Sequence, residues 1–106
     1  MATGRLGHAD LAAGVNTALY TVPANNFSIV SVNLVNSGYS AIAVRIAVCS
    51  TASPALSEYI EYDVEVLSKG VLERTGIALA AGQILIVYSS AVSVSAVCFG
   101  IETSTA

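Results

Sequence analysis

The heptapeptide at residues 28–34, Ser-Ile-Val-Ser-Val-Asn-Leu, decides the fold, because apolar side chains alternate along it with small or polar ones. Alternation of this kind puts every second side chain on the same side of an extended chain and predicts a β-strand with one buried face. Val30, Val32 and Leu34 are therefore expected to point into a core. The same pattern recurs at residues 42–48 and 92–97.

The opposite faces of these strands carry mainly alanine and serine, where a free monomer usually carries charged side chains for solubility. Only 10% of the residues are charged, and the mean hydropathy is +0.73. A small, uncharged outer face predicts a chain that lies packed against other protein. This favours a component of an assembly over an enzyme.

Length and charge narrow the possible classes further. A chain of 106 residues corresponds to one domain with a core of its own. Four basic and seven acidic residues give a net charge of −3, so nucleic-acid binding has no electrostatic basis. We find neither the apolar segment of a signal peptide nor a run of about 20 apolar residues for a membrane span. We therefore expect no nucleic-acid partner and no membrane partner.

Turn residues divide the chain into seven expected strands, spaced as in a β-sandwich or a small antiparallel barrel. The expected strands are 17–22, 27–35, 42–49, 58–66, 71–77, 83–88 and 92–101. The fold class is all-β, a single antiparallel β-sandwich of about seven strands. Immunoglobulin-like and jelly-roll topologies both remain open.

Three of the strands that follow residues 28–34 in the sequence should complete the core. The expected contributors are Ile42, Val44, Ile46, Val48, Ile60, Tyr62, Val64, Val66 and either Ile84, Ile86 and Tyr88 or Leu85 and Val87. Because strand 83–88 is apolar on both sides, it is expected to be central in its sheet or covered twice.

Residues 1–16 are expected to form an extended N-terminal arm, since they hold three glycines and show no periodicity. Residues 9–13 are compatible with one helical turn. The sandwich domain then spans 17–103, and 104–106 form a short tail. Arms of this kind are often ordered only by a neighbouring subunit. The candidate interface residues in the arm are Arg5, Leu6, His8 and Leu11.

Glu61, Asp63 and Glu65 alternate along strand 58–66, so we expect the three carboxylates to share one face, together with Tyr59. A charged edge strand that prevents unwanted sheet pairing is the favoured interpretation. An intersubunit salt bridge, a metal site and catalysis are the alternatives. The arginines available for such a bridge are Arg45, Arg74 and Arg5. These arginines, Tyr59 and the three carboxylates are all candidate interface residues.

Catalytic and metal motifs do not emerge from the remaining residues. A Ser-His-Asp triad needs a rigidly held base, and His8, the only histidine, falls in the expected arm. Zinc needs three or four nitrogen or sulfur ligands, and the chain offers only His8, Cys49 and Cys98. We predict no catalytic residue, cofactor or metal. The two cysteines are expected to be free, partly buried thiols, with a disulfide as the alternative.

Several segments carry a resemblance that runs over nearly the whole chain. They are Gly-Arg-Leu-Gly at 4–7 with Ala-Asp-Leu at 9–11, Leu-Tyr-Thr-Val-Pro-Ala at 19–24, Val-Asn-Leu-Val-Asn at 32–36, Glu-Tyr-Ile-Glu-Tyr-Asp at 58–63, Gly-Val-Leu-Glu-Arg-Thr-Gly-Ile at 70–77 and Ala-Gly-Gln at 81–83. In this order they resemble a family of small virion structural proteins of tailed phages, especially cyanophages. The most specific part is 71–77 with the Ala-Gly turn that follows.

The resemblance implies a β-sandwich that works in the virion and carries no catalytic motif. The first expectation is a capsid cement (decoration) protein that stabilises the outer capsid lattice, with the major capsid protein and copies of itself, as a dimer or trimer, for partners. A small tail, fibre or baseplate component is the alternative. A further alternative, from the residues, is a glycan-binding module that uses Tyr59 and its acidic neighbours on a host-surface glycan.

Overall fold

The computed structural model describes residues 3–105, which form eight strands and one short 3₁₀ turn. The strands are β1 (Thr3–Asp10), β2 (Thr17–Thr21), β3 (Asn26–Asn36), β4 (Ile42–Cys49), β5 (Tyr59–Val66), β6 (Val71–Leu79), β7 (Ile84–Ser89) and β8 (Val94–Ser104). The 3₁₀ turn η1 (Leu56–Glu58) lies between β4 and β5. Within the described residues, no helix has the length and apolar character to cross a membrane.

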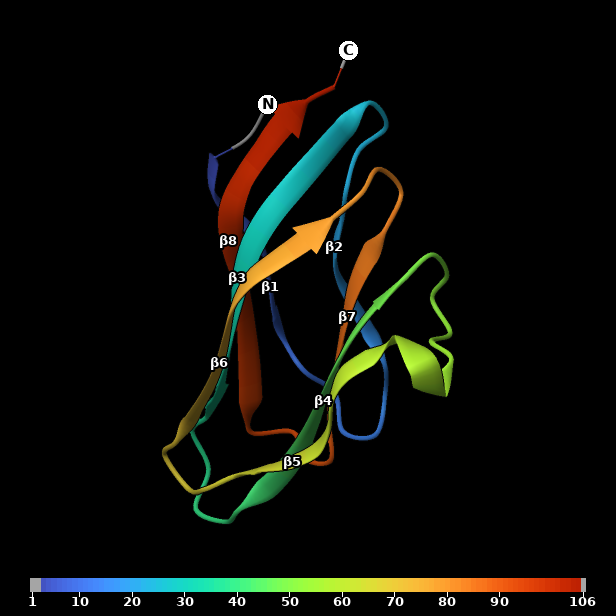
Figure 1. The fold of residues 1–106 in the computed structure, drawn as a ribbon. Helices are drawn as coiled ribbons and strands as arrows, with labels where there is room; N and C mark the ends of the chain where they lie inside the picture. Colours follow the sequence, from blue (N-terminus) through green and yellow to red (C-terminus); the bar gives the residue numbers. More distant parts are fainter. Residues whose placement is uncertain (1–2, 106) are drawn as a thin grey trace.

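The strands form two four-stranded antiparallel sheets that pack face to face, as Figure 1 shows. Sheet A has the order β1-β8-β3-β6, and sheet B has the order β2-β7-β4-β5. Only β4 and β5 follow one another in the same sheet, whereas every other connection crosses between the sheets. An eight-stranded double sheet wound in this way is a jelly roll. The predicted all-β sandwich is confirmed, and it contains eight strands rather than about seven.

The additional strand is β1, which lies where an arm was expected. Residues 3–10 pair with β8, from Thr3 opposite Ile101 to Asp10 opposite Ser95. Residues 3–10 of the expected arm therefore form an edge strand of sheet A. The prediction of a helical turn at residues 9–13 is wrong. Residues 1, 2 and 106 of the expected arm and tail lie outside the described residues.

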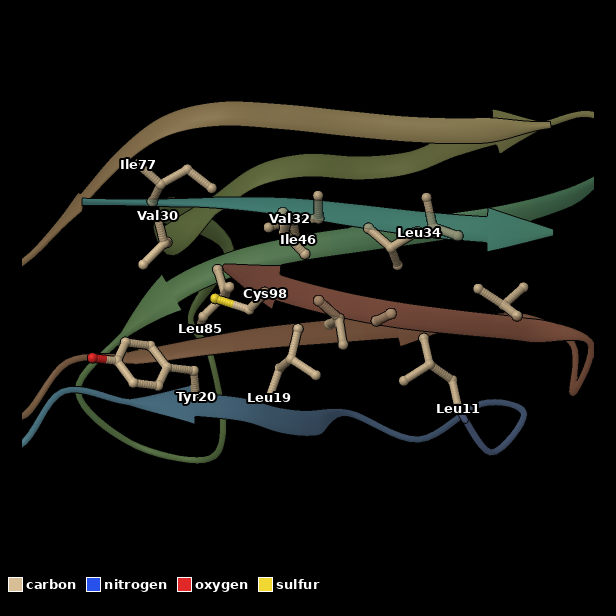
Figure 2. Packing of buried hydrophobic residues seen from close by; sticks show 14 of the residues in the cluster. Leu11, Leu19, Tyr20, Val30, Val32, Leu34, Ile46, Ile77, Leu85 and Cys98 are labelled. Carbon is tan, nitrogen blue, oxygen red and sulfur yellow. The ribbon is translucent and has the colours of Figure 1, made fainter. Parts of the chain in front are cut away.

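The core between the sheets contains the side chains that alternation predicts for β3. Val30, Val32 and Leu34 are fully buried, and Figure 2 shows them facing side chains from sheet B. The buried residues that face them are Ile42, Val44, Ile46, Val66, Leu85 and Val87. Of the two possible faces of β7, the structure thus turns Leu85 and Val87 inward. β7 is a central strand, between β2 and β4, as predicted.

Asn36, the last residue of β3, holds the loops together at one end of the sandwich. Its buried side-chain amide nitrogen donates to the carbonyl oxygens of Ser40 at 2.8 Å and of Val66 and Leu67 at 3.2 Å each. Its side-chain oxygen accepts from the Gly38 amide at 3.0 Å and from the Ser93 hydroxyl at 3.3 Å. One side chain therefore connects the β3–β4, β5–β6 and β7–β8 loops.

A second buried polar cluster lies toward the other end of β3. The Tyr20 hydroxyl donates to Glu102 Oε2 at 2.6 Å and lies 2.7 Å from Ser28 Oγ, and all three residues are buried. Ser28 therefore points inward beside Val30, while Ile29 points outward. Burial and the hydrogen bond to Glu102 raise the pKa of Tyr20 to about 12, because both favour the neutral phenol.

Candidate interaction surfaces

The three carboxylates of β5 do not share one face, contrary to the sequence-based prediction. The pairing with β4 shifts twice between Val44 and Ala47, and Asp63 has a φ of 52° in the left-handed region. A bulge of this kind inserts a residue and moves the side chains beyond it to the other face. The same irregularity brings Tyr62, expected in the core, to the outside, where it is 48% exposed.

Each of two carboxylates on β5 instead has its own arginine within the chain. Asp63 Oδ1 accepts a hydrogen bond from Arg45 Nε at 2.6 Å, while Arg74 Nη1 lies 3.3 Å from Glu61 Oε2. β5 and β6 are the edge strands of the two sheets, so the Arg74–Glu61 pair spans an open side of the sandwich. Glu65 lies opposite Ala43 of β4. The charged residues do stand on an edge strand, as the favoured interpretation requires.

Arg45 lies between two tyrosine rings on the outer face of sheet B. Its guanidinium carbon is 4.3 Å from the ring centroids of both Tyr62 and Tyr88. Tyr59 packs edge-on against Tyr62, with centroids 5.0 Å apart and the planes at 86°. The hydrogen bond to Asp63 raises the pKa of Arg45, so the cation is retained. Tyr59 therefore belongs to an aromatic cluster around Arg45.

The sequence did not predict that Tyr62 and Tyr88 contact Arg45. They come from β5 and β7, the two strands that flank β4 in sheet B. Arg45 and Tyr88 are register partners, whereas Tyr62 reaches Arg45 only through the bulge. An exposed cation–π contact contributes about 0.5–1 kcal/mol, so the cluster is a modestly stabilised surface feature.

The four candidate interface residues near the N-terminus divide into two pairs. Arg5 and His8 are exposed and lie opposite Phe99 and Val97 of β8, on the outer face of sheet A. Leu6, at the bulge in β1, packs against the core, and Leu11 is itself buried in it. A partner can therefore reach Arg5 and His8, whereas Leu11 has a role in folding.

The outer face of sheet A carries exposed apolar side chains that sequence reasoning did not assign to a site. Ile29 of β3 and Ile101 of β8 are register partners and are 53% and 54% exposed. Phe27 is also exposed beside them, and Phe99 lies in the next outward position of β8. The signal was available, since Phe27 and Ile29 occupy the positions of β3 that alternate with the buried ones. The outer face is thus more apolar than its alanines and serines suggest.

Cys49 and Cys98 are both free and buried, which confirms the prediction for the thiols. Cys98 lies in the main core, where burial raises its pKa to about 11. Cys49 belongs to a separate small cluster with Ala47 and Ile86, against which Tyr59 packs. The two sulfur atoms thus belong to separate clusters, and the disulfide alternative is not realised.

The two outer faces therefore differ in chemistry. Sheet B presents Arg45 within its tyrosine cluster, and sheet A presents an apolar centre between Arg5 and His8 on β1 and Glu73 on β6. Over residues 3–105, neither face is hollowed into a pocket. Comparison of the chain with protein-family models, with curated proteins and with solved structures gives no match.

Proposed function

We propose that the chain is a non-enzymatic structural protein of a tailed-phage virion, and specifically a capsid cement protein. It binds the outer capsid lattice and stabilises it, with the major capsid protein and copies of itself as partners. Assembly takes place in the host cytoplasm, and the finished particle is its location. The sequence resemblance to small virion proteins is the starting point of this proposal.

One structural observation supports the proposal most: the apolar outer face of sheet A. Ile29, Ile101 and Phe27 are exposed side by side on neighbouring strands. Contiguous apolar surface rimmed by polar residues is typical of protein–protein contact sites. A chain with such a face is suited to permanent contact with other subunits.

The jelly-roll strand order adds support at the level of fold analogy. Double-sheet jelly rolls occur in viral capsid proteins and also in lectins, so the fold agrees with a particle role without demanding it. As a cement protein, the chain acts through many weak contacts repeated over a lattice. Repetition converts modest single affinities into strong overall binding.

The copy number in purified virions tests this function. Quantitative mass spectrometry measures the ratio of the chain to the major capsid protein, and a cement protein gives a ratio near one or a simple lattice fraction. A few copies per particle would contradict the cement role and indicate a tail, fibre or baseplate component. Absence from the particle would refute the virion role altogether.

A second candidate function, glycan binding, is favoured by the aromatic cluster around Arg45. Tyr62 is about half exposed there, with Tyr59 edge-on beside it, and aromatic rings of this kind serve as stacking surfaces for ligands. Glycan-array binding by the wild-type chain that is lost in Tyr62→Ala would support this function. Tyr39→Ala is the control, because Tyr39 is even more exposed but lies in the β3–β4 loop. Binding that survives Tyr62→Ala would exclude the cluster as the glycan site.

A further inference from the structure

The outer face of sheet A is organised in rows, because the antiparallel register sets one residue of each strand beside its neighbours. One row runs from a histidine on β1 to a carboxylate on β6: His8, Val97, Asn33 and Glu73. The adjacent row begins with Arg5 beside Phe99 and Ser31, and the row beyond it contains Ile101 and Ile29. Arg5 and His8 thus lie along one edge of the face, where Asp10 occupies the next row, and Glu73 lies along the other edge.

The two central strands of this face are also complementary in side-chain size. Phe99 of β8 stands beside Ser31 of β3, and Val35 of β3 stands beside Ser95 of β8. In these two rows a large side chain on one strand thus stands beside a small one on the other. A second surface with the opposite order of sizes would interdigitate with it, as the inner faces of packed sheets do.

We propose that the outer face of sheet A binds the same face of a second copy of this chain, around a two-fold axis parallel to the strands and between β8 and β3. Rotation about this axis sets β8 over the partner's β3 and β1 over the partner's β6, with no shift along the strands. A two-fold contact of this kind is self-complementary and closes after two copies. The proposal deepens the self-association named under the proposed function.

Packing in this arrangement follows from the rows. Phe99 of each copy lies over a serine of the other, at position 31, and Ile101 lies over an isoleucine, at position 29. The exposed apolar side chains of both copies are removed from water together. This burial supplies the main driving force for association.

Charge complementarity favours a second copy over another partner. Within one chain, His8 and Glu73 stand three strand spacings apart, about 14 Å, which is too far for a contact. The two-fold axis brings His8 of one copy opposite Glu73 of the other, and does so twice. Arg5 in the adjacent row adds a permanent positive charge near each of these contacts. Asp10 lies in the row on the other side of His8, with Val71, and balances the charge of Arg5, so the complementarity depends on the His8–Glu73 contacts themselves.

The size of the face is sufficient for a specific dimer. Four strands of these lengths cover roughly 600 Å² of sheet surface, given strand spacings of about 4.8 Å and about 3.3 Å per residue. The two copies together would bury about 1,200 Å², at the lower end of the range for specific interfaces. An area of this size is compatible with a specific dimer, and the affinity depends on how well the two faces fit.

Sedimentation equilibrium of the full chain tests the proposal at concentrations up to about 100 µM, which detects dimers with a Kd in the micromolar range. We expect a dimer for the wild type and at least about 100-fold weaker association for Ile29→Lys, because the axis buries two uncompensated ammonium groups. Leu56→Lys is the matched control, since this exposed residue lies in η1, and it should dimerise like the wild type. Circular dichroism verifies that both variants are folded.

Charge exchange tests the orientation of the two copies. His8→Glu and Glu73→Lys should each weaken the dimer, whereas an equimolar mixture should associate at least about threefold more tightly than either variant alone. In the mixed dimer the new carboxylate at position 8 faces the new ammonium at position 73, and the other contact is that of the wild type. A wild-type monomer, a trimer, a dimer that survives Ile29→Lys or a mixture without rescue would overturn the proposal. These experiments need no virion, so their failure is distinguishable from an unfavourable copy number.

Discussion

Asn36→Ala should be among the most damaging single substitutions outside the apolar core. The substitution removes a buried amide that connects three loops through five hydrogen bonds. The backbone of β3 and its neighbours keep their sheet pairing, so the loss is confined to this end of the sandwich.

The magnitude follows from the surroundings of each partner. The contact with the Val66 carbonyl is buried, and loss of a donor there costs about 1–3 kcal/mol because water cannot readily replace it. The bonds to Ser40, Leu67, Gly38 and Ser93 are half-buried, so water recovers part of each, and a typical net value is about 0.5–1.5 kcal/mol per bond. Since one NH₂ group serves three carbonyls, we expect a total loss of about 3–4 kcal/mol. This loss is a large share of the free energy of unfolding of an ordinary domain, which is about 5–15 kcal/mol.

Urea unfolding followed by far-ultraviolet circular dichroism measures this loss. Asn26→Ala is the matched control, because Asn26 lies on the same strand and donates a single exposed hydrogen bond to Ala24. The control should lose less than about 1 kcal/mol. All chains are compared at one protein concentration, since self-association would add a concentration-dependent term. Equal losses in the two variants would refute the role assigned to Asn36.

Three further predictions concern titration, close packing and thiol access. The neutral Tyr20 phenol stabilises the fold fully below pH 10, and this contribution of about 2 kcal/mol is lost as the pH rises toward 12. Urea unfolding at a series of pH values should therefore show that the free energy of unfolding falls less steeply with pH in Tyr20→Phe than in the wild type. Identical slopes in the two proteins would contradict the assignment. Gly100→Ala should prevent folding, because a Cβ there collides with the Ile29 carbonyl oxygen; a native circular dichroism spectrum would contradict this. Cys49 and Cys98 should react with a thiol reagent only after unfolding, and fast native labelling would disprove their burial.

The core was predictable because its main strands obey a simple rule. Alternation along β3 and β4 identified the buried side chains, such as Val32 and Ile46, without knowledge of their partners. β7 could be recognised as central because both of its faces are apolar, although its inward face could not be chosen. That choice depends on pairing with β2 and β4, which is a long-range property.

β1 was missed because its strand character depends on a partner at the other end of the sequence. Gly4 and Gly7 weaken local strand preference, and the bulge between Arg5 and Gly7 interrupts alternation. Gly7 is nevertheless required where it is, since a Cβ there would collide with the Leu19 carbonyl oxygen. Close approach of this kind becomes visible only when the sheets are assembled.

The surface residues were identified more reliably than their arrangement. Glu61, Asp63, Arg45 and Arg74 do lie together around β5, yet the period-two rule gave the wrong faces because it assumes a regular strand. The positive φ at Asp63 breaks that regularity. Aspartate tolerates this conformation better than most residues, but an aspartate alone does not announce a bulge.

The winding of the chain between its two sheets also determines when the protein can fold. β3 pairs with β6 and β8, and it contacts residues as distant as Thr103 opposite Phe27. At about 5–20 residues per second, a ribosome needs several seconds to deliver β8 after β3 has emerged. Until then β3 exposes unpaired backbone groups and a strongly apolar surface, which are the features that promote misassociation. High production of this chain therefore requires that newly made copies be kept apart until β8 completes sheet A.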